Sequence, residues 1–381
     1  MQQNGIHQKK INQIYKKENK IVQLLFLGDL LYDYDEIKAD IKEIGEYFKE
    51  NNYYTILNLE APLKSNDPIK KWINLYQSER IFEILKLLNV KAVCLSNNHI
   101  MDWGEEGLNR LLKKLEIFDI NYFGAGQDLI QALTPAILEL NNCRIGLLSF
   151  GWNEEMCVYA KDNKPGVAPL NKKAIIQTIK KLKEKVDLLI VNLHWGYEYE
   201  VYPLPLHRRL ALDIIDAGVE LIVGHHSHII QAYEEYKGKK IYYGLGNFYF
   251  GNRRNTFNKN NIGQKLSKYG LGVLYNNTRY SVKHIYFKYE NDRTRIVEDY
   301  KLENISAISL TEYANNYKKL RTTHCKPILY TGKYQNYTNN LKLKISKFKR
   351  MIINLAIKSF IRIRIYNFVK KFIKKLKIIR Y

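Results

Sequence analysis

The chain has few cysteines and no long uncharged apolar run, and each of these features excludes a class of protein. The four cysteines are far apart in a chain of 381 residues: Cys94, Cys143, Cys157 and Cys325. Neither a disulfide framework nor a cysteine metal site is therefore expected, and a reducing compartment is compatible. Residues 1–20 are polar and rich in lysine, so we expect no signal peptide or N-terminal span. No stretch has the uncharged apolar length that a transmembrane helix needs.

Acidic residues are absent after Glu312, and this locates the positive charge of the chain. The net charge is +23, but residues 313–381 carry 19 lysines and arginines and no acid. Residues 1–312 therefore hold 42 basic and 38 acidic side chains, a balance of only +4. This nearly neutral part argues against nucleic acid as a partner, because phosphate binding needs a basic surface.

The sequence divides into three parts by composition. We expect a polar N-terminal extension at 1–20, an α/β domain at 21–312 and a basic tail at 313–381 that is amphipathic from about 341. Apolar residues recur at helical spacing in this tail: Ile361, Ile365, Phe368, Phe372, Ile373 and Leu376. Such a helix can bind an anionic membrane surface. A helix packed on the main domain and a nucleic-acid arm are the alternatives.

Polar residues follow most of the predicted buried strands. Strands alternate with helical segments, which is typical of an α/β sheet, and are predicted at 23–27, 53–59, 90–95, 120–123, 186–193 and 221–223. The polar groups after them are Asp29, Glu60, Asn98, His99, His194, His226 and His228. Open α/β sheets bind ligands at the carboxyl ends of their strands. Each cluster alone is compatible with turn or capping chemistry. The repeated placement of such clusters at strand ends is what favours a ligand site.

Other segments have simpler patterns. Helices are predicted at 35–50, 78–89 (capped by Ser78), 105–115, 171–185 and 206–217. A hairpin is predicted at 135–150, paired strands at 229–233 and 240–250, and antiparallel strands at 269–300. Residues 153–170 are predicted to form an irregular loop over a site.

The collected side chains suit a particular class of metal ion. His225, His226 and His228 lie within four positions, which on their own fit a metal site and a polar loop equally well. Together with two carboxylates and a carboxamide they suit Mn²⁺, Fe or Zn²⁺ better than Mg²⁺ or Ca²⁺. The set is large enough for one or two ions. Two ions sharing a carboxylate would activate a water and neutralise the oxygens of a phosphoester.

Six ordered motifs carry a family resemblance over roughly residues 21–250. They are Gly28-Asp29, Asn58-Leu-Glu60-Ala-Pro62, Ser96-Asn-Asn-His99-Ile-Met-Asp102-Trp-Gly104, His194-Trp-Gly-Tyr-Glu198-Tyr, Gly224-His-His-Ser-His228 and Leu245-Gly-Asn247-Phe. The chain resembles the CapA family of capsule and poly-γ-glutamate synthesis proteins, which is similar to the calcineurin-like metallophosphoesterases. The resemblance implies an α-β-β-α sandwich of two mixed sheets with outer helices and a metal site at one rim.

The resemblance also implies roles for individual residues. Asp29 would bind a first metal with His228, and Glu60 would bridge to a second. The ligands of the second metal would be Asn98, His194 and His226. His99, oriented by Asp102, would donate a proton to the leaving oxygen or stabilise the transition state. The residues that would support the ligands or contact substrate are Asn58, His225, Glu198 and Asn247, although His225 has no counterpart in the simplest alignment.

Two departures from the family pattern keep alternatives open. Metallophosphoesterases usually have Asp-x-His at the first strand, whereas Leu30 and Leu31 follow Asp29, and Glu60 stands where those enzymes have Asp. The sequence therefore predicts either a metal-dependent hydrolase with a phosphoester or polymer-linked substrate, or a metal-binding, non-catalytic factor of the polymer machinery. The family commonly has an N-terminal membrane anchor, which is not visible here. We therefore expect a cytoplasmic protein whose basic tail contacts the inner face of the cell membrane.

Overall fold

The computed structural model describes residues 22–71, 73–251, 266–277, 281–298 and 300–324. They belong to one compact unit. The predicted N-terminal extension and the amphipathic tail from 341 lie outside the described residues. Within the described ranges, no helix is both long enough and apolar enough to cross a membrane.

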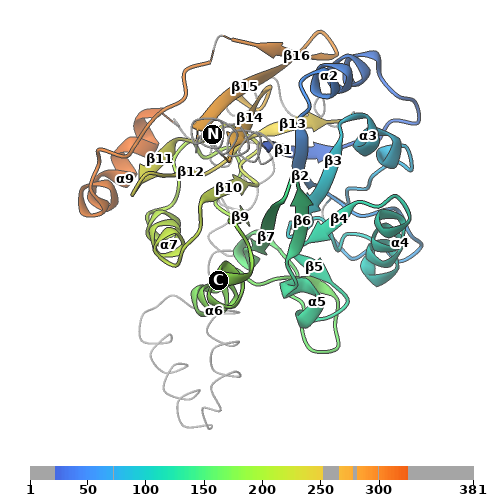
Figure 1. Cartoon of the computed structure of the whole chain (residues 1–381), viewed down its shortest axis with the longest axis horizontal. Coiled ribbons are helices and arrows are strands. Elements are labelled where there is room, and N and C mark those ends of the chain that lie inside the picture. Colours follow the sequence, from blue (N-terminus) through green and yellow to red (C-terminus); the bar gives the residue numbers. More distant parts are fainter. Residues whose placement is uncertain (1–21, 72, 252–265, 278–280, 299, 325–381) are drawn as a thin grey trace, which may run out of the picture. The chain divides into compact units, whose positions relative to one another are not determined.

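The first sheet has eight strands in the order β16-β15-β14-β1-β2-β3-β4, with β13 also beside β1 (Figure 1). The strands are β1 (Gln23–Leu31), β2 (Tyr54–Leu59), β3 (Val90–Cys94), β4 (Asn121–Phe123), β13 (Asn247–Phe250), β14 (Tyr269–Asn276), β15 (Ser281–Glu290) and β16 (Arg293–Val297). Strands β13, β1, β2, β3 and β4 run parallel, and β14 to β16 are antiparallel.

The second sheet has six strands in the order β11-β12-β10-β9-β7-β6. They are β6 (Ala136–Leu140), β7 (Cys143–Gly151), β9 (Leu188–His194), β10 (Leu221–His225), β11 (Tyr233–Tyr236) and β12 (Lys239–Tyr242). Strands β7, β9, β10 and β12 are parallel, so their carboxyl ends lie at one rim. The short β5 (Ala125–Gly126) and β8 (Gly166–Val167) pair with each other, and α5 (Leu129–Leu133) follows β5.

The two sheets pack face to face, and helices cover their outer faces. Helices α2 (Ala39–Glu50), α3 (Ile81–Leu87) and α4 (Gly104–Ile117) share a core with the first sheet. Helices α6 (Lys172–Leu182), α7 (Pro205–Asp216) and α9 (Leu310–His324) share one with the second sheet. A third cluster lies between the sheets and joins Phe26 and Ile56 to Ile190 and Val223. The predicted sandwich of two mixed sheets with outer helices is confirmed.

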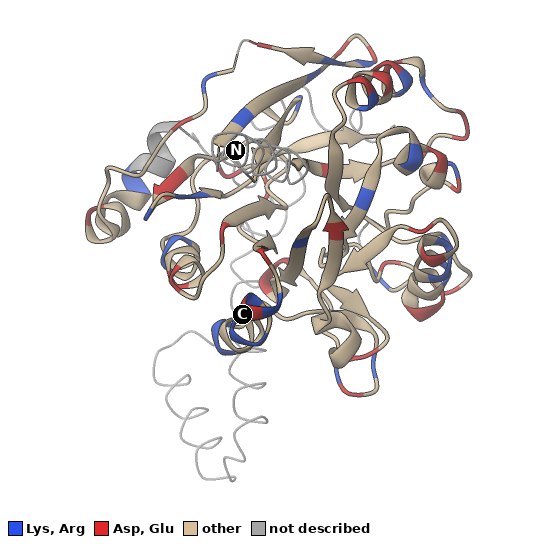
Figure 2. Cartoon of the chain, viewed as in Figure 1, with Lys and Arg blue, Asp and Glu red and all other residues tan. Residues whose placement is uncertain are grey.

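The hydrophobic pattern explains these layers. In β1, Leu24 and Phe26 face the second sheet, while Leu25 and Leu27 face the helices, because side chains alternate along a strand. In α4, the buried leucines recur with the period of a helix and cover the first sheet: Leu108, Leu111, Leu112 and Leu115. Lys, Arg, Asp and Glu lie mainly over the outer helices and loops (Figure 2).

Two predicted hairpins are confirmed in detail. Strands β6 and β7 meet at Asn141 and Asn142, whose φ angles of 49° and 58° suit a tight hairpin turn. The antiparallel strands predicted at 269–300 are present as β14 to β16. Strands β15 and β16 turn at Asn291 and Asp292, which have φ angles of 53° and 58°. Asn and Asp adopt this left-handed conformation more readily than other non-glycine residues, which is why such pairs predict turns.

Several predictions of local structure are wrong in their bounds, and the helix predicted at 35–50 begins only at Ala39. Asp29 lies inside β1 and not after it, because β13 pairs with the last part of that strand. The segment predicted as one strand at 240–250 is two strands, with β12 in the second sheet and β13 in the first. Its predicted partner at 229–233 begins only at Tyr233, as β11. The helix predicted from Ser78 begins at Ile81, although the Ser78 hydroxyl accepts a hydrogen bond from the Arg80 amide (3.2 Å).

Candidate metal centre

The side chains predicted as ligands converge because their strands are parallel. Asp29 lies in β1, Glu60 follows β2 and Asn98 follows β3. From the second sheet, His194 and His225 are the last residues of β9 and β10. The carboxyl ends of parallel strands meet at one edge of a sheet, so the two sheets bring these groups to a common rim.

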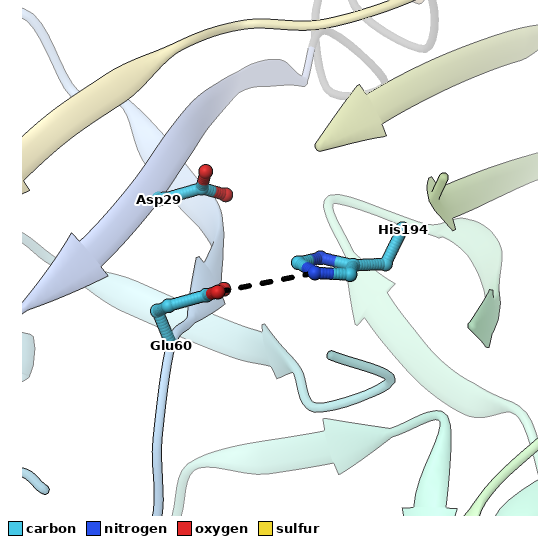
Figure 3. A group of neighbouring side chains, drawn as sticks. All are labelled: Asp29, Glu60 and His194. Carbon is cyan, nitrogen blue, oxygen red and sulfur yellow. Dashed lines mark ion pairs between the residues drawn. The ribbon is translucent and has the colours of Figure 1, made fainter. Parts of the chain in front are cut away.

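Three of these residues form the tightest cluster. One potential ligand atom from each of Asp29, Glu60 and His194 lies within 4.8 Å of the others, and all three residues are buried. Figure 3 shows the two carboxylates from the first sheet facing the imidazole from the second, with Glu60 Oε1 3.8 Å from His194 Nε2. Among the described residues, Glu60 Oε1 has no hydrogen-bond partner. The cluster therefore offers a buried acceptor that a cation could use.

Asp29 is approached by two imidazoles and one amide. His228 Nδ1 lies 3.2 Å from Asp29 Oδ2, and His225 Nδ1 lies 3.5 Å from Asp29 Oδ1. Asn58 donates a hydrogen bond to Asp29 Oδ1 (2.8 Å). Burial alone would raise the pKa of Asp29, but the neighbouring imidazoles of His225 and His228 hold it well below its ordinary value. Asp29 is therefore ionised.

The pKa of Glu60 is shifted in the opposite direction from that of Asp29. Burial, together with the nearby charge of Asp29, raises the pKa of Glu60 to about 8. Asn58 also donates to Glu60 Oε2, so one amide holds both carboxylates in place. Two buried carboxylates side by side repel each other, and a cation between them removes the repulsion.

A second group of residues surrounds His194. Its Nε2 lies 3.1 Å from Asn98 Oδ1, and its ring centroid lies 4.8 Å from that of His226. Burial and the neighbouring His226 lower the pKa of His194 well below its ordinary value, so the ring is neutral and can offer a lone pair. Glu155 reaches in from the segment predicted as a loop, with Oε2 3.5 Å from His226 Nε2.

The backbone after β10 is strained where it presents these imidazoles. His226 and His228 have φ angles of 86° and 55°, in the left-handed region that residues other than glycine rarely adopt. Such conformations cost on the order of 1–3 kcal/mol each and concentrate at functional sites. The strain lies in the two histidines that the sequence predicts as ligands.

His99 belongs to a separate hydrogen-bonded chain beside the cluster. Its Nδ1 lies 2.6 Å from Asp102 Oδ2. Asp102 also accepts from the Lys71 ammonium (2.7 Å) and from the Leu75 amide (2.8 Å). Lys71 donates in addition to the Asn98 carbonyl (2.6 Å), which joins this chain to the cluster.

The remaining predicted residues lie around His228. Asn247 Oδ1 is 2.9 Å from His228 Nδ1. Burial would lower the pKa of His228, but its pairing with Asp29 raises it to about 9, with a further contribution from the charge of Glu198. The structure thus brings the predicted residues into one region.

Sequence reasoning missed three polar residues of this region: Lys71, Glu155 and Asn192, which lies 3.2 Å from His225. Glu155 follows the end of β7, so it could have been identified, like the other groups, as a polar residue just after a strand. Lys71 lies in an irregular segment with no periodic signal. Asn192 is the one polar residue of β9 before His194, and nothing in the local sequence reveals its contact.

The fold and this rim define a class of protein: an α/β sandwich with a buried cluster of carboxylates and imidazoles between two sheets. The family model described as "Bacterial capsule synthesis protein PGA_cap" matches residues 5–252. The chain belongs to this family of bacterial capsule synthesis proteins.

Two curated relatives agree with this assignment. The PGA biosynthesis protein CapA of Bacillus subtilis (strain 168) is 34% identical over 241 residues, covering 60% of this chain and 63% of the relative. The capsule biosynthesis protein CapA of Bacillus anthracis is 29% identical over 254 residues, covering 61% of each chain. The chain thus spans about three fifths of the length of these relatives.

Solved structures with partial similarity are more distant. A novel phosphatase from Mycoplasma pneumoniae has a TM-score of 0.42 and 14% identity, covering 73% of this chain and 93% of that chain. The NAD nucleotidase of Haemophilus influenzae has a TM-score of 0.43 and 12% identity, covering 73% of this chain and 49% of that chain.

Proposed function

We propose that the chain is a divalent-metal-dependent phosphoester hydrolase in the synthesis of a capsule or exopolymer of the poly-γ-glutamate type. The observation that carries the proposal is the convergence of Asp29, Glu60 and His194, with ligand atoms within 4.8 Å of one another. A buried carboxylate oxygen without a hydrogen bond, such as Glu60 Oε1, is costly to keep ionised unless a cation is bound. The residues therefore fit a metal ion.

The chemistry of the candidate ligands suggests which residues would hold each ion and which metals they would bind. Asp29 and His228 would hold one ion, Glu60 would bridge, and a second group would hold another: Asn98, His194 and His226. Mixed carboxylate and imidazole donors favour Mn²⁺, Fe or Zn²⁺. When bound, such ions lower the pKa of a coordinated water and neutralise phosphoester oxygens.

The neighbouring polar chain supplies the proton chemistry. Asp102 accepts from His99 Nδ1 and so fixes the orientation of the ring. His99 would then protonate the leaving oxygen through Nε2, while Lys71 keeps Asp102 in place. The substrate would be a phosphoester, free or linked to the polymer.

Hydrolysis of an aryl phosphate in the presence of Mn²⁺ tests the proposal. We expect activity in the wild-type protein and its loss on chelation. His99→Ala should lower kcat by roughly 10²–10⁴-fold, the usual contribution of a general acid, without changing the bound metal. Equal kcat in the two proteins would contradict the role of His99, and no hydrolysis of any phosphoester by the metal-loaded protein would contradict the proposed activity.

A second candidate is a metal-binding factor of the polymer machinery without catalysis. It is favoured by Leu31, which stands where the Asp-x-His pattern of metallophosphoesterases has its histidine. Leu31 packs in an apolar cluster with Ala61, Leu75 and Phe250. Metal binding without hydrolysis would support this candidate.

A further inference from the structure

We propose that His225 is a metal ligand that supplies, from the second sheet, the imidazole missing after Asp29. The inference rests on the proposed metal site and assigns it one more residue. Leu31 cannot fill this place, because its side chain is apolar and buried in its own cluster.

The strand register points His225 toward the cluster. On β10, Val223 packs in the core between the two sheets, and His225 two positions later shares its face because side chains alternate along a strand. His225 is also paired with His194 on the parallel strand β9. Both imidazoles therefore point toward the first sheet, where Asp29 lies.

The hydrogen bonding of the ring is that of a metal-bound histidine. Asn192 presents Oδ1 to His225 Nε2 at 3.2 Å, so Nε2 carries the hydrogen and donates it. The lone pair then lies on Nδ1. Histidine ligands commonly donate their other ring N–H to an oxygen acceptor, which fixes the tautomer and orients the ring.

The surroundings of Nδ1 favour a cation. Nδ1 is 3.5 Å from Asp29 Oδ1, and among the described residues it has no hydrogen-bond partner. With the Nδ1 lone pair free in the metal-bound state, one ion can be bound by both Nδ1 and Asp29 Oδ1, which are close enough to share it. His225 and His228 would then hold the first ion together with Asp29.

Metal binding by matched variants tests the inference. Chelator competition measures the number of bound Mn²⁺ or Zn²⁺ ions per chain and their dissociation constants for the wild type, His225→Ala and His225→Gln. His207→Ala is the control, because His207 is another buried imidazole but stacks on Trp195. Unfolding curves in chelator check that each variant folds.

Asn192 provides a second test that leaves the ligand in place. Asn192→Asp keeps an acceptor for Nε2–H and should bind metal at least as tightly as the wild type does. Asn192→Leu removes the acceptor and should weaken binding by about 10–100-fold, as losses of such supporting contacts do.

The expected result is the loss of one ion, or at least about tenfold weaker binding, in both His225 variants but not in the control. Wild-type ion number and affinity in folded His225→Ala and His225→Gln would overturn the inference, as would equal binding by Asn192→Asp and Asn192→Leu. If the wild type binds no ion, the proposed function itself fails. This result differs from wild-type metal binding in the His225 variants, which would contradict only the role of His225.

Discussion

At the scale of single residues, Lys71 shows how a buried charge can organise a site. Its side chain is 9% exposed, and its ammonium donates to both Asp102 and the Asn98 carbonyl. It therefore fixes the residue that orients His99 and the turn that carries Asn98.

We predict that Lys71→Met lowers kcat by roughly 10–100-fold and leaves KM unchanged, because it disturbs the orientation of His99, the proposed general acid. Steady-state kinetics with Mn²⁺ measure the effect. Lys70→Met is the matched control at the exposed neighbouring lysine. Equal losses in both variants, or a change in KM alone, would contradict the positioning role.

His207 gives a prediction for stability. Burial, with a smaller effect of His226, lowers its pKa from 6.5 to about 3. The unfolded chain therefore binds this proton near pH 6.5 and the folded chain does not. The stability from this group is present above pH 6.5 and is lost as pH falls toward 3.

We expect the free energy of unfolding to fall by up to about 2 kcal/mol between pH 6.5 and 5 through this one group. Urea unfolding in chelator measures it. His207→Phe, which keeps a ring between Trp152 and Trp195, should show a shallower loss. The same slope in both proteins would rule out His207 as the source.

At the scale of elements, the sequence predicts the type of most strands and helices but not all their partners. Apolar runs ending in polar residues located β1, β2, β3, β9 and β10, because a buried strand has a strong local signal. The place of β13 in the first sheet depends on a long-range pairing with Asp29, which no local pattern contains. The same limit explains why the contacts of Lys71 and Asn192 were missed.

The buried pair of Arg208 and Glu234 joins α7 to β11. The guanidinium donates to both Glu234 oxygens (2.9 and 2.6 Å) and to the carbonyls of Ile305 and Ile308. Arg208→Ala should destabilise the fold by about 3–5 kcal/mol, because it leaves a buried carboxylate unpaired.

Chemical denaturation measures this loss against an exposed pair. Lys237→Ala removes the pair with Asp216, in which the two side chains are 63% and 44% exposed. It should cost no more than about 1 kcal/mol. A loss as small for Arg208→Ala would show that the buried pair does not hold these elements together.

At the scale of the whole molecule, the basic charge is concentrated after the last strand. Both sheets come from the nearly neutral residues 1–312, whereas residues 313–381, which begin within α9, carry 19 basic side chains and no acid. Basic amphipathic segments bind anionic membranes, and salt weakens this attraction. Membrane contact through the basic tail therefore stays a prediction from the sequence.

We predict that the full chain co-sediments with liposomes containing anionic lipid and that a chain lacking residues 341–381 does not. Neutral liposomes are the control, and added salt should weaken the binding. Equal sedimentation of the two chains would contradict a membrane role for this segment.

The number of metal ions per chain tests the central claim most directly. After loading with Mn²⁺ and dialysis, elemental analysis should find at least one ion in the wild type, and fewer in the double variant Asp29→Asn with Glu60→Gln. A wild-type protein without bound metal, or a double variant with the same content, would contradict a metal centre formed by these residues.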